Sequence, residues 1–189
     1  MQKLHLITRD DAGLSLAYIL LTKENLFATN GSCGIIISTK DVLGDSFQED
    51  LPADVRVLIH GKDWAKLCKP DVEFIRWDNG IQVMKKKGLV DYIKVSTEEK
   101  VSKFPSLEHV IPSECNASVN VMGINPTDLY NLGQALYPQP EKKGRLKQPL
   151  FLKNSKEKDG FSAGPIDVRM QERHDDITYK AVIMPTFNE

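Results

Sequence analysis

The sequence predicts an α+β protein in which a strand, a helix and three strands follow one another twice. Two observations lead to this prediction: runs of β-branched and aromatic residues bounded by turn residues, and one short helical segment early in each series. The two units are expected over residues 55–96 and 117–185, with additional strands before them in residues 1–40. A chain of 189 residues can hold this arrangement as one domain.

The leading segment is expected to form three strands, at residues 14–21, 26–29 and 34–38. Asn30-Gly31 is a strong turn signal between the last two, because both residues tolerate a positive φ. Residues 41–54 follow with five acidic side chains and no Lys or Arg, which predicts an acidic surface loop.

The first unit has one strand, one short helix and three strands, expected at residues 55–59, 62–69, 72–77, 81–85 and 89–95. Pro70 ends the helix because proline cannot continue it. Asn79-Gly80 between two strand-like runs is the clearest hairpin in the chain.

The second unit repeats that order, with elements expected at residues 117–122, 126–137, 149–153, 165–171 and 177–184. Asn125 is a good helix N-cap, and Pro126 suits the first helical position. Residues 138–160 carry seven basic and three acidic side chains, which predicts a flexible basic insertion around one short strand. The two units agree in element order more than in residue identity, so the sequence does not establish a repeat.

Composition limits the classes of function. Hydrophobic residues make up 41% of the chain and charged residues 27%, which is ordinary for a globular protein. A formal net charge of −1 gives no global basic field for nucleic acid. Three widely spaced cysteines indicate reduced thiols in a cytoplasmic protein, and no apolar run is long enough to cross a membrane.

No motif indicates catalysis. The four histidines lack metal-ligand spacing, and no glycine-rich phosphate loop occurs, so neither a metal nor a cofactor is expected. Cys33 lies at an expected turn without a local base, so a turn is favoured over a nucleophile. Trp64 is expected in the core and Trp77 at a hairpin edge, and no regular aromatic interleaving indicates a base-stacking platform.

Three short signatures lie at turns and strand ends: Ala28-Thr29-Asn30-Gly31, Phe104-Pro105 followed by Val110-Ile111-Pro112, and Val182-Ile183-Met184-Pro185. In this order they resemble the bacterial sliding clamp, the β subunit of the replicative DNA polymerase. The resemblance implies a DNA-clamp-like fold, with two βαβββ units related by a pseudo-two-fold axis. It also implies a groove for a protein partner, lined here by Pro105, Val110, Val182 and Met184. Where that family has His-Arg-Leu after the first turn, this chain has Ser32, Cys33 and Gly34, so one wall of that groove lacks its bulk.

Clamp helices of that family meet the phosphates of DNA through basic side chains. Lys62, Lys66 and Lys69 follow the i, i+4, i+7 spacing of one helix face and are the expected DNA contacts. The expected second helix has no basic residue. The resemblance therefore implies a non-catalytic protein that contacts duplex DNA without sequence preference in replication or repair. The alternative is a monomeric protein-interaction module. A ring around DNA would require a homo-oligomer whose edge strands pair.

Overall fold

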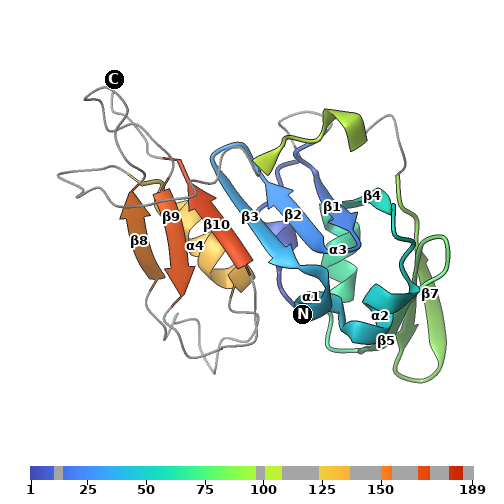
Figure 1. Cartoon of the computed structure of the whole chain (residues 1–189). Helices are drawn as coiled ribbons and strands as arrows, with labels where there is room; N and C mark the ends of the chain where they lie inside the picture. The colour runs from blue at the N-terminus through green and yellow to red at the C-terminus, as the bar shows by residue number, and fades with distance from the viewer. Residues whose placement is uncertain are drawn as a thin grey trace.

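The computed structural model of the chain describes residues 1–10, 15–96, 101–107, 124–136, 150–154, 166–170 and 179–184. Within these residues it is an α+β structure with two antiparallel sheets and few helices (Figure 1), as the sequence predicts. The strand predicted at residues 117–122 and most of the predicted insertion at residues 138–160 lie outside the described residues.

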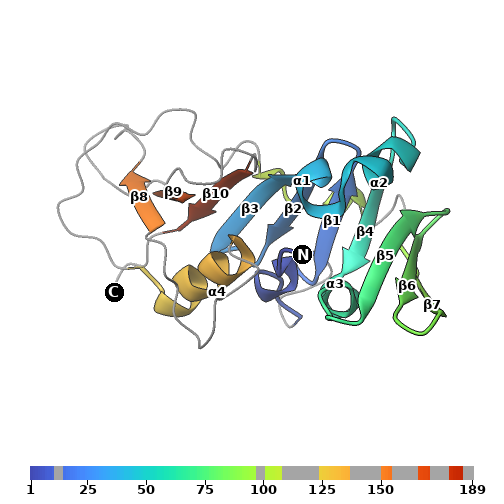
Figure 2. The ribbon, with the colours of Figure 1, turned by 90° about the horizontal axis from the view of Figure 1, so that it is seen from below.

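The larger sheet has seven strands in the order β4-β1-β2-β3-β10-β9-β8. In chain order these strands are β1 (Tyr18–Thr22), β2 (Asn25–Thr29), β3 (Cys33–Ser38), β4 (Arg56–His60), β8 (Leu150–Asn154), β9 (Ile166–Met170) and β10 (Tyr179–Ile183). The smaller sheet consists of β5 (Val72–Trp77), β6 (Ile81–Lys85) and β7 (Leu89–Ile93). It lies at the opposite end of the molecule from β8 (Figures 1 and 2).

The helical segments are η1 (Leu4–Leu6), α1 (Thr39–Leu43), α2 (Asp45–Asp50), α3 (Gly61–Leu67), η2 (Val101–Lys103) and α4 (Pro126–Leu136). The last of these begins at the predicted N-cap, where the Asn125 side chain accepts a hydrogen bond from the Thr127 amide at 2.9 Å. α3, η1 and α4 cover one face of the large sheet (Figure 2).

The leading strands form the centre of the large sheet. β3 pairs with β2 on one side, for example Phe27 opposite Ile36, and with β10 on the other, where Val182 lies opposite Gly34. β4 also joins this sheet by pairing with β1, whereas β5, β6 and β7 pair among themselves. The first predicted unit is therefore divided between two sheets.

The central strand β3 is covered on both faces, because all five residues from Cys33 to Ile37 are buried. Side chains alternate between faces, so Ile35 and Ile37 face the helices while Ile36 faces away from them. On the face away from the helices, a second cluster contains Leu20, Phe27, Ile36 and Leu58 together with Val101, Phe104 and Leu107 from the segment after β7.

The predicted acidic loop at residues 41–54 is wrong, because α1 and α2 occupy most of it. The Ser38 hydroxyl accepts a hydrogen bond from the Asp41 amide and begins α1. Val42, Leu43 and Phe47 are buried, and the Phe47 ring meets the Trp77 ring edge-on at a centroid distance of 6.5 Å. The apolar side chains of the two helices pack into the core, and the acidic side chains lie on the outside of the helices.

The turn between β2 and β3 is bonded to α4 through Asp128, which is only 5% exposed. Its carboxylate accepts hydrogen bonds from the Asn30 side-chain amide at 2.8 Å and from the Ser32 hydroxyl at 2.9 Å. The Asn30 side-chain oxygen accepts from the backbone amides of Ser32 and Cys33 at 2.9 and 2.8 Å, and Gly31 supplies the positive φ of the turn. This network joins segments almost one hundred residues apart in the sequence.

We expect Asp128→Ala to lower the free energy of unfolding by about 1–3 kcal/mol, because it removes the carboxylate that two partly buried donors, the Asn30 amide and the Ser32 hydroxyl, share. Urea unfolding followed by circular dichroism measures the change. Asp63→Ala is the control, since it removes a carboxylate from a partly exposed ion pair with Lys66 and should cost less than about 1 kcal/mol. Equal losses in the two variants would contradict a structural role for the Asp128 network.

Candidate functional site

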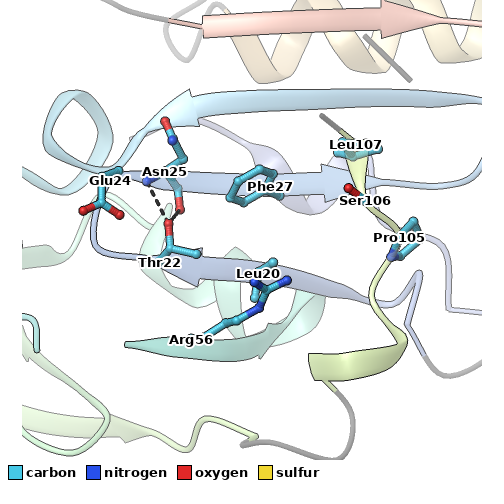
Figure 3. A pocket seen from close by; sticks show the side chains of 9 residues that line it. All are labelled: Leu20, Thr22, Glu24, Asn25, Phe27, Arg56, Pro105, Ser106 and Leu107. Carbon is cyan, nitrogen blue, oxygen red and sulfur yellow. Dashed lines mark hydrogen bonds between the residues drawn. The ribbon is translucent and has the colours of Figure 1, made fainter. Parts of the chain in front are cut away.

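A groove lies on the face of the large sheet that faces away from the helices (Figure 3). We call it the Phe27 groove. Its volume is about 250 Å³, and it is lined by Leu20, Thr22, Glu24, Asn25, Phe27, Arg56, Pro105, Ser106 and Leu107. Pockets for small ligands measure roughly 300–1,000 Å³, so this groove is sized for one or two amino-acid side chains.

The wall of the groove is held in place by Gly34. A Cβ at that position would lie 3.1 Å from Leu107 Cδ2, so the absence of a side chain lets Leu107 pack directly onto β3. Phe104 and Leu107 are both buried and anchor the segment between them at the groove. The side chains of Pro105 and Ser106 in that segment are exposed. Gly34 is one of the small residues that follow the turn, and its lack of a side chain leaves room for Leu107 from another segment.

The groove has an apolar floor and polar margins. Leu20 and Phe27 form the floor, and Figure 3 shows Arg56 beside Leu20 and Glu24 at the far end of β1. The Thr22 hydroxyl donates to the Asn25 carbonyl at 2.9 Å and accepts from the Asn25 amide at 3.0 Å, which closes the β1–β2 turn. Among the described residues, neither Arg56 nor Glu24 has an ion-pair partner, so both charged groups are available to a bound molecule.

The structure brings one of the four predicted partner-groove residues to this groove, namely Pro105. Val182 is 2% exposed and lies on the same face of the sheet, opposite Gly34 in β3. Met184 is partly buried just after β10, and its amide donates to the Ser32 carbonyl at 2.7 Å. Val110 lies outside the described residues. Partner binding at these four positions stays a prediction.

The three predicted DNA contacts are exposed at α3 and the turn after it. Lys62 pairs with Asp10, and Lys66 pairs with Asp63 at 2.6 Å, while Lys69 lies beyond the last helical residue. The hydrogen bonds to these carboxylates raise the pKa of both paired lysines. A phosphate at this surface would compete with a carboxylate at two of the three positions.

The cysteines offer no activated nucleophile within the described residues. Burial raises the pKa of the Cys33 thiol to about 12, with the nearby Asp128 carboxylate adding to the effect. Burial also raises the pKa of the Cys68 thiol, which lies 4.0 Å from His5 Nδ1. No cluster of three metal-ligating side chains occurs in the part of the chain that the structure describes. Among those residues, no helix is long and apolar enough to span a membrane.

Sequence reasoning missed most of the Phe27 groove. Leu20, Phe27 and Arg56 belong to strands that the sequence predicts, and their period-two alternation places Leu20 and Phe27 on one face. No local signal pairs β4 with β1 or lays residues 104–107 across them. The one available hint was Gly34, since a glycine inside a strand often marks a close approach of another segment.

No protein-family model matches the chain, and no curated protein matches it. Among solved structures, it is similar to the β subunit from DNA polymerase of Streptococcus pyogenes, with a TM-score of 0.47 and 9% identity. It is also similar to the β chain of DNA polymerase III from Streptococcus pneumoniae TIGR4, with a TM-score of 0.48 and 11% identity. Each match covers 98% of this chain but only 63% and 62% of those chains, so this chain spans less than two thirds of their length. These are β subunits of the kind that the sequence motifs resemble.

We expect Cys33 to resist iodoacetamide in the folded protein at mildly alkaline pH, because it is buried and keeps its proton. Its pKa rises from 9.0 to about 12 on folding, so its contribution to stability is complete below pH 9.0 and is lost as the pH rises toward about 12. Peptide mass mapping before and after unfolding measures the labelling, with the half-buried Cys68 as the internal reference. Labelling of native Cys33 as fast as in the unfolded chain would contradict the assignment.

Proposed function

We propose that this protein is a non-catalytic binding module that holds a segment of a protein partner in the Phe27 groove. The carrying observation is an apolar floor of Leu20 and Phe27 with Arg56 beside it and Glu24 at one end, neither of which has an ion-pair partner in the part of the chain that the structure describes. A partner that inserts one apolar side chain and offers its own charges would match both features. From the motif resemblance we take the partner to be a protein of DNA replication or repair.

The groove also suits an extended peptide better than a small molecule. The groove has a volume of about 250 Å³ and is lined by residues of β1 and β2, with Pro105 and Ser106 on its far side (Figure 3). A short segment could lie along this wall with its anchor side chain over Phe27. Buried apolar anchors of this kind dominate the binding free energy of most peptide interfaces.

We further propose that residues 55–96 and 117–185 are related βαβββ units in a pseudo-two-fold arrangement. The order β4, α3, β5, β6, β7 supports this for the first unit, and α4, β8, β9, β10 agrees with the second. α3 and α4 cover the same face of the large sheet, as two equivalent helices would (Figure 2).

Ser106→Trp tests the groove, because an exposed serine at its wall can be enlarged without disturbing the core. Short peptides selected from a display library against the unmodified protein are the probe, and binding is measured by fluorescence anisotropy. We expect Ser106→Trp to weaken the selected peptides at least about tenfold, since the indole fills the space of the anchor side chain.

Lys103→Trp is the matched control, as an exposed residue of the same segment outside the groove, and it should leave the affinity unchanged. Selected peptides that bind both variants equally, or a library that yields no binder, would overturn the proposal.

A second candidate function is sequence-independent contact with duplex DNA through Lys62, Lys66 and Lys69. The exposure of these lysines on the helix-covered side of the sheet favours DNA contact. The ion pairs of Lys62 and Lys66 with carboxylates argue against it, because a phosphate would have to displace them. We expect Lys62→Glu with Lys66→Glu to abolish most binding of an arbitrary duplex in a gel-shift assay at low salt, because phosphate contacts carry that affinity.

Lys103→Glu with Lys180→Glu is the charge-matched control, since both lysines are exposed and lie away from α3. Equal binding by both double variants would remove the α3 site. Light scattering across a concentration series accompanies this test, because a closed ring around DNA requires several copies of the chain.

A further inference from the structure

The exposed large apolar side chains of the described residues are concentrated on the small sheet. They are Phe74, Met84, Leu89, Val90 and Tyr92, with Tyr130 on α4 as the exception. This concentration is unusual for a free surface, where large apolar side chains are normally scattered singly.

The pairing register places most of them on one face. Phe74 lies opposite Met84, and Met84 opposite Val90, which gives an apolar row across all three strands. The next row on the same face is Arg76, Gln82 and Tyr92. The opposite face holds Ile75, Ile81, Val83 and Ile93, which are buried in the core. We call the first of these faces the outer face; it carries one half-exposed aromatic ring on each edge strand.

The Tyr92 ring is held in a fixed position on this face. Its hydroxyl donates to the Asp78 carbonyl at 3.2 Å, and a Cβ at Gly80 would lie 2.5 Å from its Cζ atom. The ring therefore lies against the Gly80 backbone, in space that a Cβ at position 80 would fill. Half of Tyr92 remains exposed, so the ring offers a surface without having to be ordered first.

Exposed cations outnumber exposed acidic residues on and beside the outer face. Arg76, Lys86, Lys87 and Lys94 are exposed on or beside the outer face, against the acidic Glu73 and Asp78. The Arg76 guanidinium is held on the face by donating to the Gln82 side-chain oxygen at 2.8 Å, and the Gln82 amide in turn donates to the Asp78 carboxylate at 2.7 Å. The surface therefore combines flat rings with an excess of positive charge.

We propose that the outer face of the β5–β6–β7 sheet binds single-stranded nucleic acid. Unpaired bases stack on Tyr92 and Phe74, and the phosphates between them meet Arg76, Lys86 and Lys94. Stacking on aromatic side chains with a basic track beside them is the chemistry that recognises unpaired strands. A duplex fits poorly, because its bases are already stacked on one another. A second copy of the chain fits poorly as well, because it would bring the same cations face to face.

This site is distinct from the Phe27 groove, which is built on β1, β2 and β4, and from the lysines of α3. No residue of the outer face lines the groove, so the two proposals can fail independently. The sequence could not reveal the site, because Phe74 and Tyr92 come together only when β6 pairs with both neighbouring strands.

Fluorescence anisotropy with labelled oligo(dT) and oligo(rU) at low salt tests the proposal. We expect Tyr92→Ala and Phe74→Ala each to weaken binding about tenfold, because each removes one stacking partner. Tyr130→Ala is the matched control, since Tyr130 is 51% exposed and Tyr92 is 50% exposed, and it should leave the affinity unchanged. Comparing the affinities for oligo(dT) and oligo(rU) shows whether the outer face prefers single-stranded DNA or single-stranded RNA.

Two further variants keep the test decisive. Lys86→Glu with Lys87→Glu should reduce the dependence of binding on salt, because fewer counterions are released. Gly80→Ala should displace the Tyr92 ring and weaken binding while Phe74 is untouched. All variants are first compared by thermal unfolding, because the substituted side chains other than Gly80 are exposed and their loss should not unfold the protein.

Three outcomes would overturn the proposal. One is absence of oligonucleotide binding at low salt by the unmodified protein. Another is an equal loss of affinity in Tyr130→Ala and Tyr92→Ala. The third is a dimer in sedimentation analysis that Tyr92→Ala converts to a monomer, which would assign the outer face to a second copy of the chain.

Discussion

The pairing of β3 with β10 is the constraint on which the rest of the structure depends. It aligns five residue pairs, from Tyr179 opposite Ile37 to Ile183 opposite Cys33, and makes one sheet from strands at both ends of the described chain. Closing so long a loop costs conformational entropy that local contacts cannot recover. The buried Asp128 network stabilises the same junction, because it bonds the turn that begins β3 to the helix that covers β10.

The two faces of this sheet are covered in different ways, and that difference creates the Phe27 groove. The helices α3 and α4 pack on one face, whereas the other is covered in part by Phe104 and Leu107, each buried against the sheet. Pro105 and Ser106 connect those two anchors and pass over the strands beside the groove. Gly34 favours the arrangement because a Cβ there would lie 3.1 Å from Leu107 Cδ2, so the end of the Leu107 side chain would have to shift by a few tenths of an ångström.

Most elements could be predicted from the sequence, whereas their assembly could not. β5 and β6 agree residue for residue with the predicted ranges, because Asn79-Gly80 fixes the hairpin between them. Residues 41–54 were assigned by charge alone, although Val42, Leu43 and Phe47 carry the apolar spacing of helices. The sequence predicts Lys62 and Lys66 as DNA contacts on one helix face, but their pairing with Asp10 and Asp63 depends on tertiary position and on side-chain rotamers. The division of β4 from β5 into different sheets has no local signal.

The central place of β3 also affects how the chain is made. Ser38 and Tyr179 are separated by more than one hundred positions, so a ribosome completes β3 long before it begins the strand that pairs with its free edge. During that interval the nascent chain presents Ile35, Ile36 and Ile37 on an edge whose backbone groups have no partner. Such an edge can template contact with neighbouring chains. The order of the strands therefore leaves this edge open to intermolecular pairing until β10 has been made.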